Sequence, residues 1–418
     1  MSNNTARKEV SFSSVISAYA DSVDSLLITL PSVMGIMDRE LKGLGKQFNE
    51  YLEKHGEKLK EENGVSTFSV KGKAASKAAK YRRLLDNGKR AYALVHRGFL
   101  ISLISQYDAY LGRLIRLHLY IHPERLDASE KQFAFKDLVS LGSIEEARES
   151  LIEREVDAVI RKSHDEQLEW VGREFKLKII DFVSEGPAFV EIAQRRHLFV
   201  HCDGVVSAQY ITKCRMAQST LQHDIAVGTQ LEVSQEYLQK AFETLYGVGI
   251  KLGIMIWLHS EKDKAEAADD LINTLALNLI SEDRHALAID ILRFSLDYRT
   301  DHPSDRVHRY QILNLAQAFK WSGQTEKCES VLARFDWSAC GDAIQLGLCC
   351  LRNDFESAAH FSRKLFHDPG FKEHYYREWP IFKEYRQSLQ FQSVYRELHG
   401  VNFEESQEKE EQTSSQKP

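Results

Sequence analysis

The chain has 418 residues, which is too long for a single average domain because a domain usually takes about 100–200 residues. Hydrophobic residues make up 43% of it, which excludes a wholly disordered protein, and its seven prolines and 22 glycines are few enough to favour long helices. The formal net charge of −6 excludes a protein that coats nucleic acid through bulk positive charge, so any contact with RNA must be local.

The N-terminal ten residues are polar and lack the apolar core of a secretion signal, which predicts a cytoplasmic protein. The longest apolar stretch, residues 245–258, contains Lys251 and is shorter than the roughly 20 residues that span a bilayer. We therefore expect no contact with a membrane. The six cysteines form no C-x-x-C pair, which favours reduced thiols over a zinc or disulfide scaffold.

Residues 1–90 are predicted to form an N-terminal helical region that contains a basic segment. Residues 65–70 alternate between apolar and polar side chains, as in a short strand. The segment 71–90 then holds eight Lys or Arg residues and one acid, a net charge of +7. Such a segment is either a solvated helix face or a surface that binds RNA by displacing counterions from its phosphates. The predicted RNA-binding residues in it are Lys77, Lys80, Arg82 and Arg83.

Residues 91–260 are predicted to form a helical bundle, because apolar side chains recur at helical spacing in four long stretches. Pro123 ends the first stretch, and Gly186-Pro187 introduces the third. Long helices with short connections are typical of a bundle. The four stretches are residues 94–119, 144–170, 189–201 and 235–258.

Helix pairs are predicted to follow in residues 265–400. Residues 315–332 and 346–364 share a helix, a polar turn and a helix about 31 residues apart, and residues 271–292 contain an earlier pair. This layout resembles tetratricopeptide repeats, which stack because one pair cannot bury its own apolar face. We expect the repeats to recognise a protein partner or a trigger. The Glu-rich residues 401–418 are predicted to be a disordered acidic tail.

The helix within residues 189–210 carries the residues that point most clearly to chemistry. On a helical wheel at about 100° per residue, Arg196 falls near the centre of the apolar stripe. A desolvated guanidinium needs a partner, which is either a carboxylate such as Asp108 or a phosphate. Arg195 points about 100° away and is predicted to lie on the surface, where it can contact RNA.

This helix resembles the R-x(4–6)-H signature of HEPN domains. Arg196 precedes His201 by five positions, the polar His197 directly follows the arginine, and an Asp203-Gly204 turn comes after the second histidine. The resemblance covers about residues 90–260 and includes an acid, Asp108, near the middle of the first long helix. It implies an all-α bundle that forms a homodimer. Many HEPN domains are metal-independent RNA endonucleases of toxin or antiviral systems, whereas others have lost catalysis and act as scaffolds.

The chemistry that this resemblance implies agrees with the residue types. RNA supplies its own nucleophile, the ribose 2′-hydroxyl, so cleavage requires proton transfer and stabilisation of charge on the phosphate. A histidine with a pKa of about 6.5 can transfer protons at neutral pH, which makes His201 the predicted general acid or base. Arg196 would hold two phosphate oxygens, with His197, Asp108 and Asp203 in support and no cofactor. Asp203 either orients His201 or caps the turn.

Two alternatives stay open for this helix. His197 and His201 have the i, i+4 spacing of a zinc site, but position 198 is leucine where a zincin has glutamate, so no metal is predicted. The second alternative is a non-catalytic HEPN-like protein that serves in dimerisation or as an adaptor. An open surface shared by Arg196 and His201 would favour the enzyme, whereas side chains sealed inside the bundle would favour the adaptor.

Overall fold

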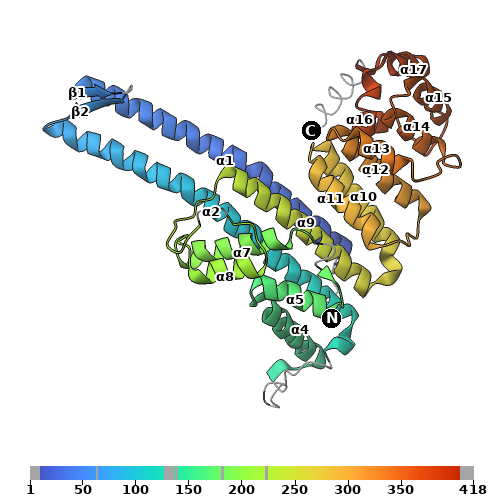
Figure 1. Cartoon of the computed structure of the whole chain (residues 1–418), viewed down its shortest axis with the longest axis horizontal. Helices are drawn as coiled ribbons and strands as arrows, with labels where there is room; N and C mark the ends of the chain where they lie inside the picture. The colour runs from blue at the N-terminus through green and yellow to red at the C-terminus, as the bar shows by residue number, and fades with distance from the viewer. Residues whose placement is uncertain are drawn as a thin grey trace, which may run out of the picture. The chain divides into compact units, whose positions relative to one another are not determined.

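The protein, seen in a computed structural model, is mostly helical with only two short strands in its described residues, and this confirms the predicted all-α class (Figure 1). The chain divides into two compact units, Met1–Ser260 and Glu261–Pro418. The residues that the structure describes are 10–62, 65–126, 136, 140–179, 183–221 and 225–404.

Two long helices and a small hairpin of strands begin the first unit. Helix α1 (Phe12–His55) and helix α2 (Lys73–Ile121) lie side by side and are joined by the antiparallel strands β1 (Glu57–Glu62) and β2 (Val65–Ser69) (Figure 1). The strand predicted near residue 65 is therefore present. The predicted boundary between residues 90 and 91 is wrong, because it falls inside α2.

Only one half of this helix pair is packed into a core. The buried residues of α1 lie between Phe12 and Met34, and those of α2 between His96 and Leu119. Residues 35–95 contain no buried side chain in their described part and form a two-helix arm that ends in the strand hairpin (Figure 1). The arm therefore presents the basic segment of residues 71–90 to solvent.

Helix α9 (Gln235–Ser260) is the core helix of the first unit, and it packs against both α1 and α2. Gly249 and Gly253 leave room for Tyr19 and Tyr110, because a Cβ atom at either glycine would overlap a tyrosine side chain. The two tyrosine rings stack with centroids 4.1 Å apart. Their hydroxyls donate to backbone carbonyls of α9 at 2.7 and 3.0 Å. These contacts join the packed halves of α1 and α2 to one central helix.

Four shorter helices of the described residues belong to the same bundle. The predicted helix over residues 144–170 is two helices, because Ser163 and Glu166 form a capping box that begins a new one. The four are α4 (Ile144–Ile160), α5 (His164–Glu174), α7 (Gly186–His201) and α8 (Ala208–Met216).

By length and composition alone, α1 and α9 could each cross a membrane. The apolar part of α9 is mostly buried inside the bundle, whereas only 22% of that of α1 is buried. The cytoplasmic location and the lack of membrane contact stay predictions.

The second unit is built from pairs of neighbouring helices, at each of the three places where a helix pair was predicted. A residue with positive φ ends the first helix of each pair: Asp283 (58°), Gly323 (76°) and Asn353 (60°). The repeated turn explains the similar layout, while the tetratricopeptide resemblance itself stays a prediction. The paired helices are α10 (Ala265–Ser281) with α11 (His285–Tyr298), α12 (Asp305–Trp321) with α13 (Thr325–Leu332), and α14 (Asp342–Leu351) with α15 (Phe355–Leu365).

An aromatic core closes the C-terminal end of the second unit. Helix α16 (Tyr375–Glu378) and helix α17 (Leu389–His399) contribute to it, together with Phe403, which is buried. The predicted start of the acidic tail at residue 401 is therefore wrong, because residues 401–404 belong to this packed region. Residues 405–418 lie outside the described part of the chain. Four short 3-10 turns complete the described elements: Pro123–Arg125, Lys262–Lys264, Pro380–Phe382 and Tyr385–Gln387.

Candidate functional site

Helix α7 and the turn after it position the candidate residues. Pro187 lies in the first turn of the helix, where its missing N–H costs nothing. The chain leaves the helix through Asp203 (φ 49°) and Gly204 (φ 83°), and the Gly204 N–H donates to the carbonyl of Leu198 at 3.0 Å. A side chain at Gly204 would clash with the ring of Phe199. The predicted helix and turn are thus present in the structure.

Arg195 is buried, so the prediction that it lies on the surface and contacts RNA is wrong. Its side chain is 8% exposed, and its Nε donates to Oε1 of Glu191 at 2.8 Å. Its Nη1 donates to the backbone carbonyl of Glu232 at 3.1 Å, and its guanidinium stacks over the ring of Tyr237. These contacts hold Arg195 inside the bundle as a structural residue.

Glu191 is the centre of this buried network. It also accepts hydrogen bonds from the hydroxyls of Tyr210 (2.6 Å) and Tyr237 (2.7 Å). Burial alone would lower the pKa of Arg195, but nearby Tyr237 and Glu191 outweigh it and the pKa is raised. Burial and Glu191 raise the pKa of Tyr210, so its hydroxyl keeps its proton and can donate. The charges of Glu191 and Arg195 are therefore compensated by each other and by the neighbouring tyrosines, without a ligand.

Arg196 is half-buried rather than central in the core. Its Nε is shielded from solvent and has no hydrogen-bond partner among the described residues. A guanidinium has five donors in a rigid fork, so Arg196 keeps the capacity to bind an anion at the exposed edge of α7. The helical wheel misplaced the two arginines because α8 and the start of α9 cover the side of α7 that holds Arg195.

Asp108 lies beside the opposite end of α7 and is not the partner of Arg196. Its Oδ1 is 3.1 Å from Nε2 of His164, although the two atoms are not aligned as a hydrogen bond. The His164 ring packs edge-on against Phe189 at the start of α7. Phe189 and Arg196 are about 10 Å apart along the helix axis. The predicted supporting role of Asp108 at the Arg/His site therefore has no geometric basis.

His197 and His201 are both exposed and lie next to each other on α7. Their ring centroids are 4.6 Å apart. Partial burial, then His201 and Arg196, lower the pKa of His197. Neutral imidazole is thus favoured at this histidine in the folded protein. Arg196, His197 and His201 together form what we call the Arg–His surface.

The turn after α7 brings in Arg97, an arginine of α2 that the sequence analysis missed. Arg97 donates to Oδ1 of Asp203 at 2.7 Å and lies over the ring of Phe199, with 4.8 Å between guanidinium and centroid. Asp203 therefore pairs with Arg97 and does not orient His201. Arg97 and Asp203 are 106 positions apart, so no local sequence pattern predicts that they pair. The packing of α2 on α7 brings them together.

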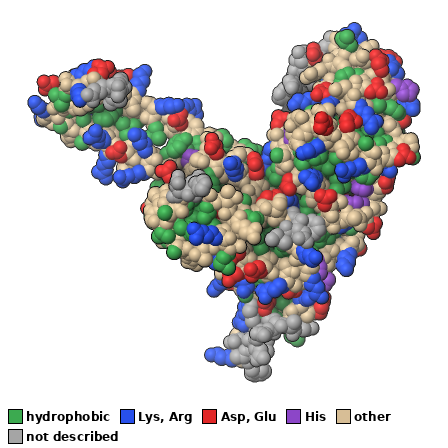
Figure 2. Space-filling model, in the orientation of Figure 1, with side chains coloured by type: hydrophobic (Ala, Val, Ile, Leu, Met, Phe, Trp, Pro, Cys, Tyr) green, Lys and Arg blue, Asp and Glu red, His purple; other side chains and the backbone are tan. Residues whose placement is uncertain are grey.

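The basic segment lies on the arm, away from the Arg–His surface. Lys77, Lys80, Arg82 and Arg83 are all exposed. In Figure 2, Lys and Arg side chains gather along the arm. From Arg83 to Arg97 the helix α2 rises about 21 Å. The structure thus does not bring the two groups of residues into one site: the basic segment lies on α2, and the Arg–His surface lies on α7.

The described residues contain no group of three or more His, Cys, Asp or Glu side chains that could hold a metal ion. The chain has no significant match to a protein-family model, to a curated protein or to a solved structure.

Proposed function

We propose that the protein is a metal-independent RNA endonuclease of the HEPN type, acting in a toxin or antiviral setting, with the Arg–His surface as its catalytic site. One observation carries the proposal: His197 and His201 are exposed and in contact on α7 with the half-buried Arg196 beside His197, while the neighbouring Arg195 is sealed in the core. A half-buried arginine beside two exposed histidines suits a phosphate that undergoes proton transfer.

The proposed reaction uses the 2′-hydroxyl of the RNA as the nucleophile. A histidine removes the proton from this hydroxyl, whose oxygen attacks the adjacent phosphorus atom. A second acid gives a proton to the departing 5′-oxygen, so the products carry a 2′,3′-cyclic phosphate and a 5′-hydroxyl. Arg196 stabilises the negative charge on the phosphate oxygens through its planar fork. His201 performs one proton transfer, with His197 beside it.

A homodimer is part of this proposal, because each chain supplies one copy of the Arg–His surface. Two copies related by a two-fold axis would bring two such surfaces to one composite cleft. The exposed arm would guide RNA by its phosphates, and the helix pairs of the second unit would sense a partner or a trigger. Light scattering at micromolar concentration measures the assembly, and a strict monomer would contradict a composite site.

The test is cleavage of mixed RNA by the purified full-length chain, with and without EDTA. His201→Ala should remove cleavage, because alanine has no titratable group. Arg196→Lys keeps the charge but loses the fork, so we expect a rate lower by about 100-fold or more. EDTA should not change the rate.

The matched control is His360→Ala, which removes an exposed histidine of the second unit and should leave cleavage intact. Cleavage by His201→Ala at the wild-type rate would overturn the proposal. A folded dimer that never cuts RNA, with any trigger tried, would favour the adaptor instead.

A further inference from the structure

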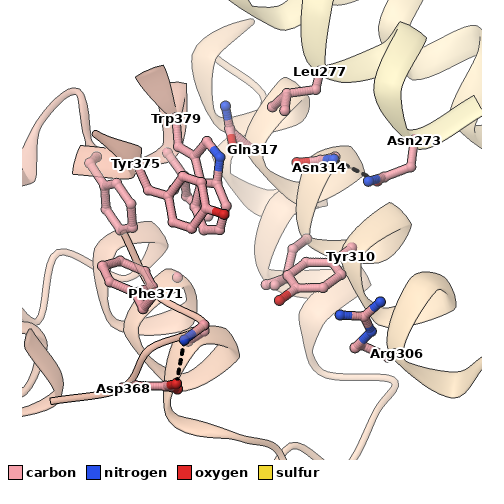
Figure 3. A pocket seen from close by; sticks show the side chains of 16 residues that line it. Asn273, Leu277, Arg306, Tyr310, Asn314, Gln317, Asp368, Phe371, Tyr375 and Trp379 are labelled. Carbon is pink, nitrogen blue, oxygen red and sulfur yellow. Dashed lines mark hydrogen bonds between the residues drawn. The ribbon is translucent and has the colours of Figure 1, made fainter. Parts of the chain in front are cut away.

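A cavity of about 430 Å³ opens in the second unit, apart from the surface to which we assign catalysis. Helices α10, α12 and α14 form one wall, and residues 368–382 form the other (Figure 3). Pockets that bind small molecules have volumes of roughly 300–1,000 Å³ and combine apolar walls with a few polar groups. The lining of this cavity has the same mixed character.

Gln317 is the most informative residue of the lining. It is 0% exposed, and neither its Nε2 nor its Oε1 has a hydrogen-bond partner among the described residues. Gln311 lies on the same helix and is equally buried, but its Nε2 donates to the carbonyl of Asp269 at 2.9 Å and its Oε1 accepts from Ser295 at 3.0 Å. A buried amide without hydrogen bonds lowers the stability of the folded protein. A ligand in the cavity could supply the hydrogen bonds that Gln317 does not make.

Aromatic side chains face the carboxamides across the cavity. Tyr375 and Trp379 stack with centroids 4.3 Å apart, and Phe371 packs edge-on against both. Tyr310 of α12 lies on the opposite side, next to the amides (Figure 3). A planar ligand in this space would have ring faces to stack on and the Gln317 amide at its edge.

Arg306 supplies a positive charge at the exposed side of the lining. The other charged lining residue, Asp368, accepts a hydrogen bond from the backbone N–H of Gly370 at 2.8 Å and lies on the side away from Arg306 (Figure 3). Asn273 and Asn314 hydrogen-bond to each other at 2.8 Å, which leaves further donor and acceptor capacity on both amides. The lining thus has a cationic side and an amide-rich side.

The chain itself covers part of the face on which an extended peptide would lie. The 3-10 turn Pro380–Phe382 packs against α10 and α14, and Ile381 approaches Gly347 so closely that a Cβ atom there would lie 3.1 Å from its Cδ1. What remains is a compact space instead of a long groove. A compact ligand therefore fits better than an extended peptide.

We propose that this cavity binds a purine mononucleotide, with the base edge on Gln317, the base plane against the aromatic wall and the phosphate toward Arg306. A glutamine amide can pair bidentately with N6 and N7 of adenine, which uses the two atoms that have no partner among the described residues. Arginine matches phosphate in charge and geometry. Because none of these residues belongs to the Arg–His surface, this inference does not depend on the proposed nuclease.

The test is isothermal titration of the full-length chain with AMP, adenosine and GMP. AMP should bind, adenosine should bind more weakly because it lacks the phosphate, and GMP should bind more weakly because its base edge differs. Gln317→Met should raise the dissociation constant for AMP at least about tenfold, since it removes the paired amide. Arg306→Gln should weaken the binding of AMP to about the affinity of adenosine and leave the binding of adenosine unchanged.

The matched control is Gln311→Met, which alters a buried glutamine of the same helix outside the cavity. It should lower the melting temperature but keep AMP affinity, whereas Gln317→Met should raise the melting temperature of the ligand-free protein. Equal AMP binding by wild type and Gln317→Met would overturn the proposal. So would the absence of binding by all three probes at millimolar concentration, which would leave a cavity filled by water or by a peptide.

Discussion

The two faces of helix α7 carry similar residues in opposite settings. On one face, Glu191 and Arg195 are buried and their hydrogen bonds are directed to groups inside the bundle. On the other face, Arg196 has an Nε without a partner among the described residues, and His197 and His201 reach solvent. The comparison shows that the type of residue does not distinguish a structural charge from a functional one. The distinction lies in whether the charge is already compensated.

The largest effect should come from making the same substitution at the two adjacent arginines. Arg195→Met leaves the Glu191 carboxylate buried without its cation, which should lower the free energy of unfolding by about 3–5 kcal/mol. Arg196→Met removes no described ion pair, so its cost should stay below about 1 kcal/mol. Urea denaturation of both variants measures the difference. Equal losses would show that both arginines are structural and would remove the contrast between the two faces.

A smaller effect should show whether the basic segment of the arm binds RNA. Neutralising Lys80 and Arg83 to Gln should weaken RNA binding and reduce the slope of log affinity against log salt by about 1.4, since each lost contact with single-stranded RNA contributes about 0.7. The matched control neutralises Lys42 and Lys46 of α1, which pair with Asp38 and Glu50 on the same arm. If both double variants bind RNA alike, the basic segment is an ordinary solvated face.

The smallest effect concerns the pKa of His197 on the exposed face. Partial burial, His201 and Arg196 lower this pKa, so the folded state disfavours the protonated form. The contribution of His197 to stability is therefore present above its unfolded pKa of about 6.5 and declines as the pH falls below that value. His201→Asn should raise the pKa of His197 in an NMR titration, while the control His360→Asn should not. An unchanged pKa would mean that the two imidazoles do not interact.

Much of the fold could be predicted because helices are local. The spacing of apolar residues predicted the helices at residues 189–201 and 235–258, and both are present. The division of residues 144–170 into two helices was missed, although Ser163 and Glu166 carry the three-residue spacing of a capping box. The boundary at residue 90 was wrong because a change in charge does not end a helix; α2 continues through it for 49 residues in all.

The site was predicted less well than the fold, because its members meet through tertiary contacts. The i, i+4 spacing of Glu191 and Arg195 was a signal that Arg195 has a local partner, and it was overlooked. Asp108 was expected near Arg196 but lies with His164 at the opposite end of α7. Arg97 had no signal at all in the sequence.

The sequence by itself determined the all-α class, the helix pairs of the second unit and the order of Arg196, His197 and His201 along one helix, because each depends on spacing within a few turns. Only the tertiary structure decided which of two adjacent arginines is buried and which of the two buried glutamines of α12 lacks a partner among the described residues. The physical reason is that Arg195 and Gln311 obtain hydrogen-bond partners 37 and 42 residues away in the sequence, whereas Gln317 faces a cavity. Periodicity specifies the face of a helix, but only packing specifies what that face meets.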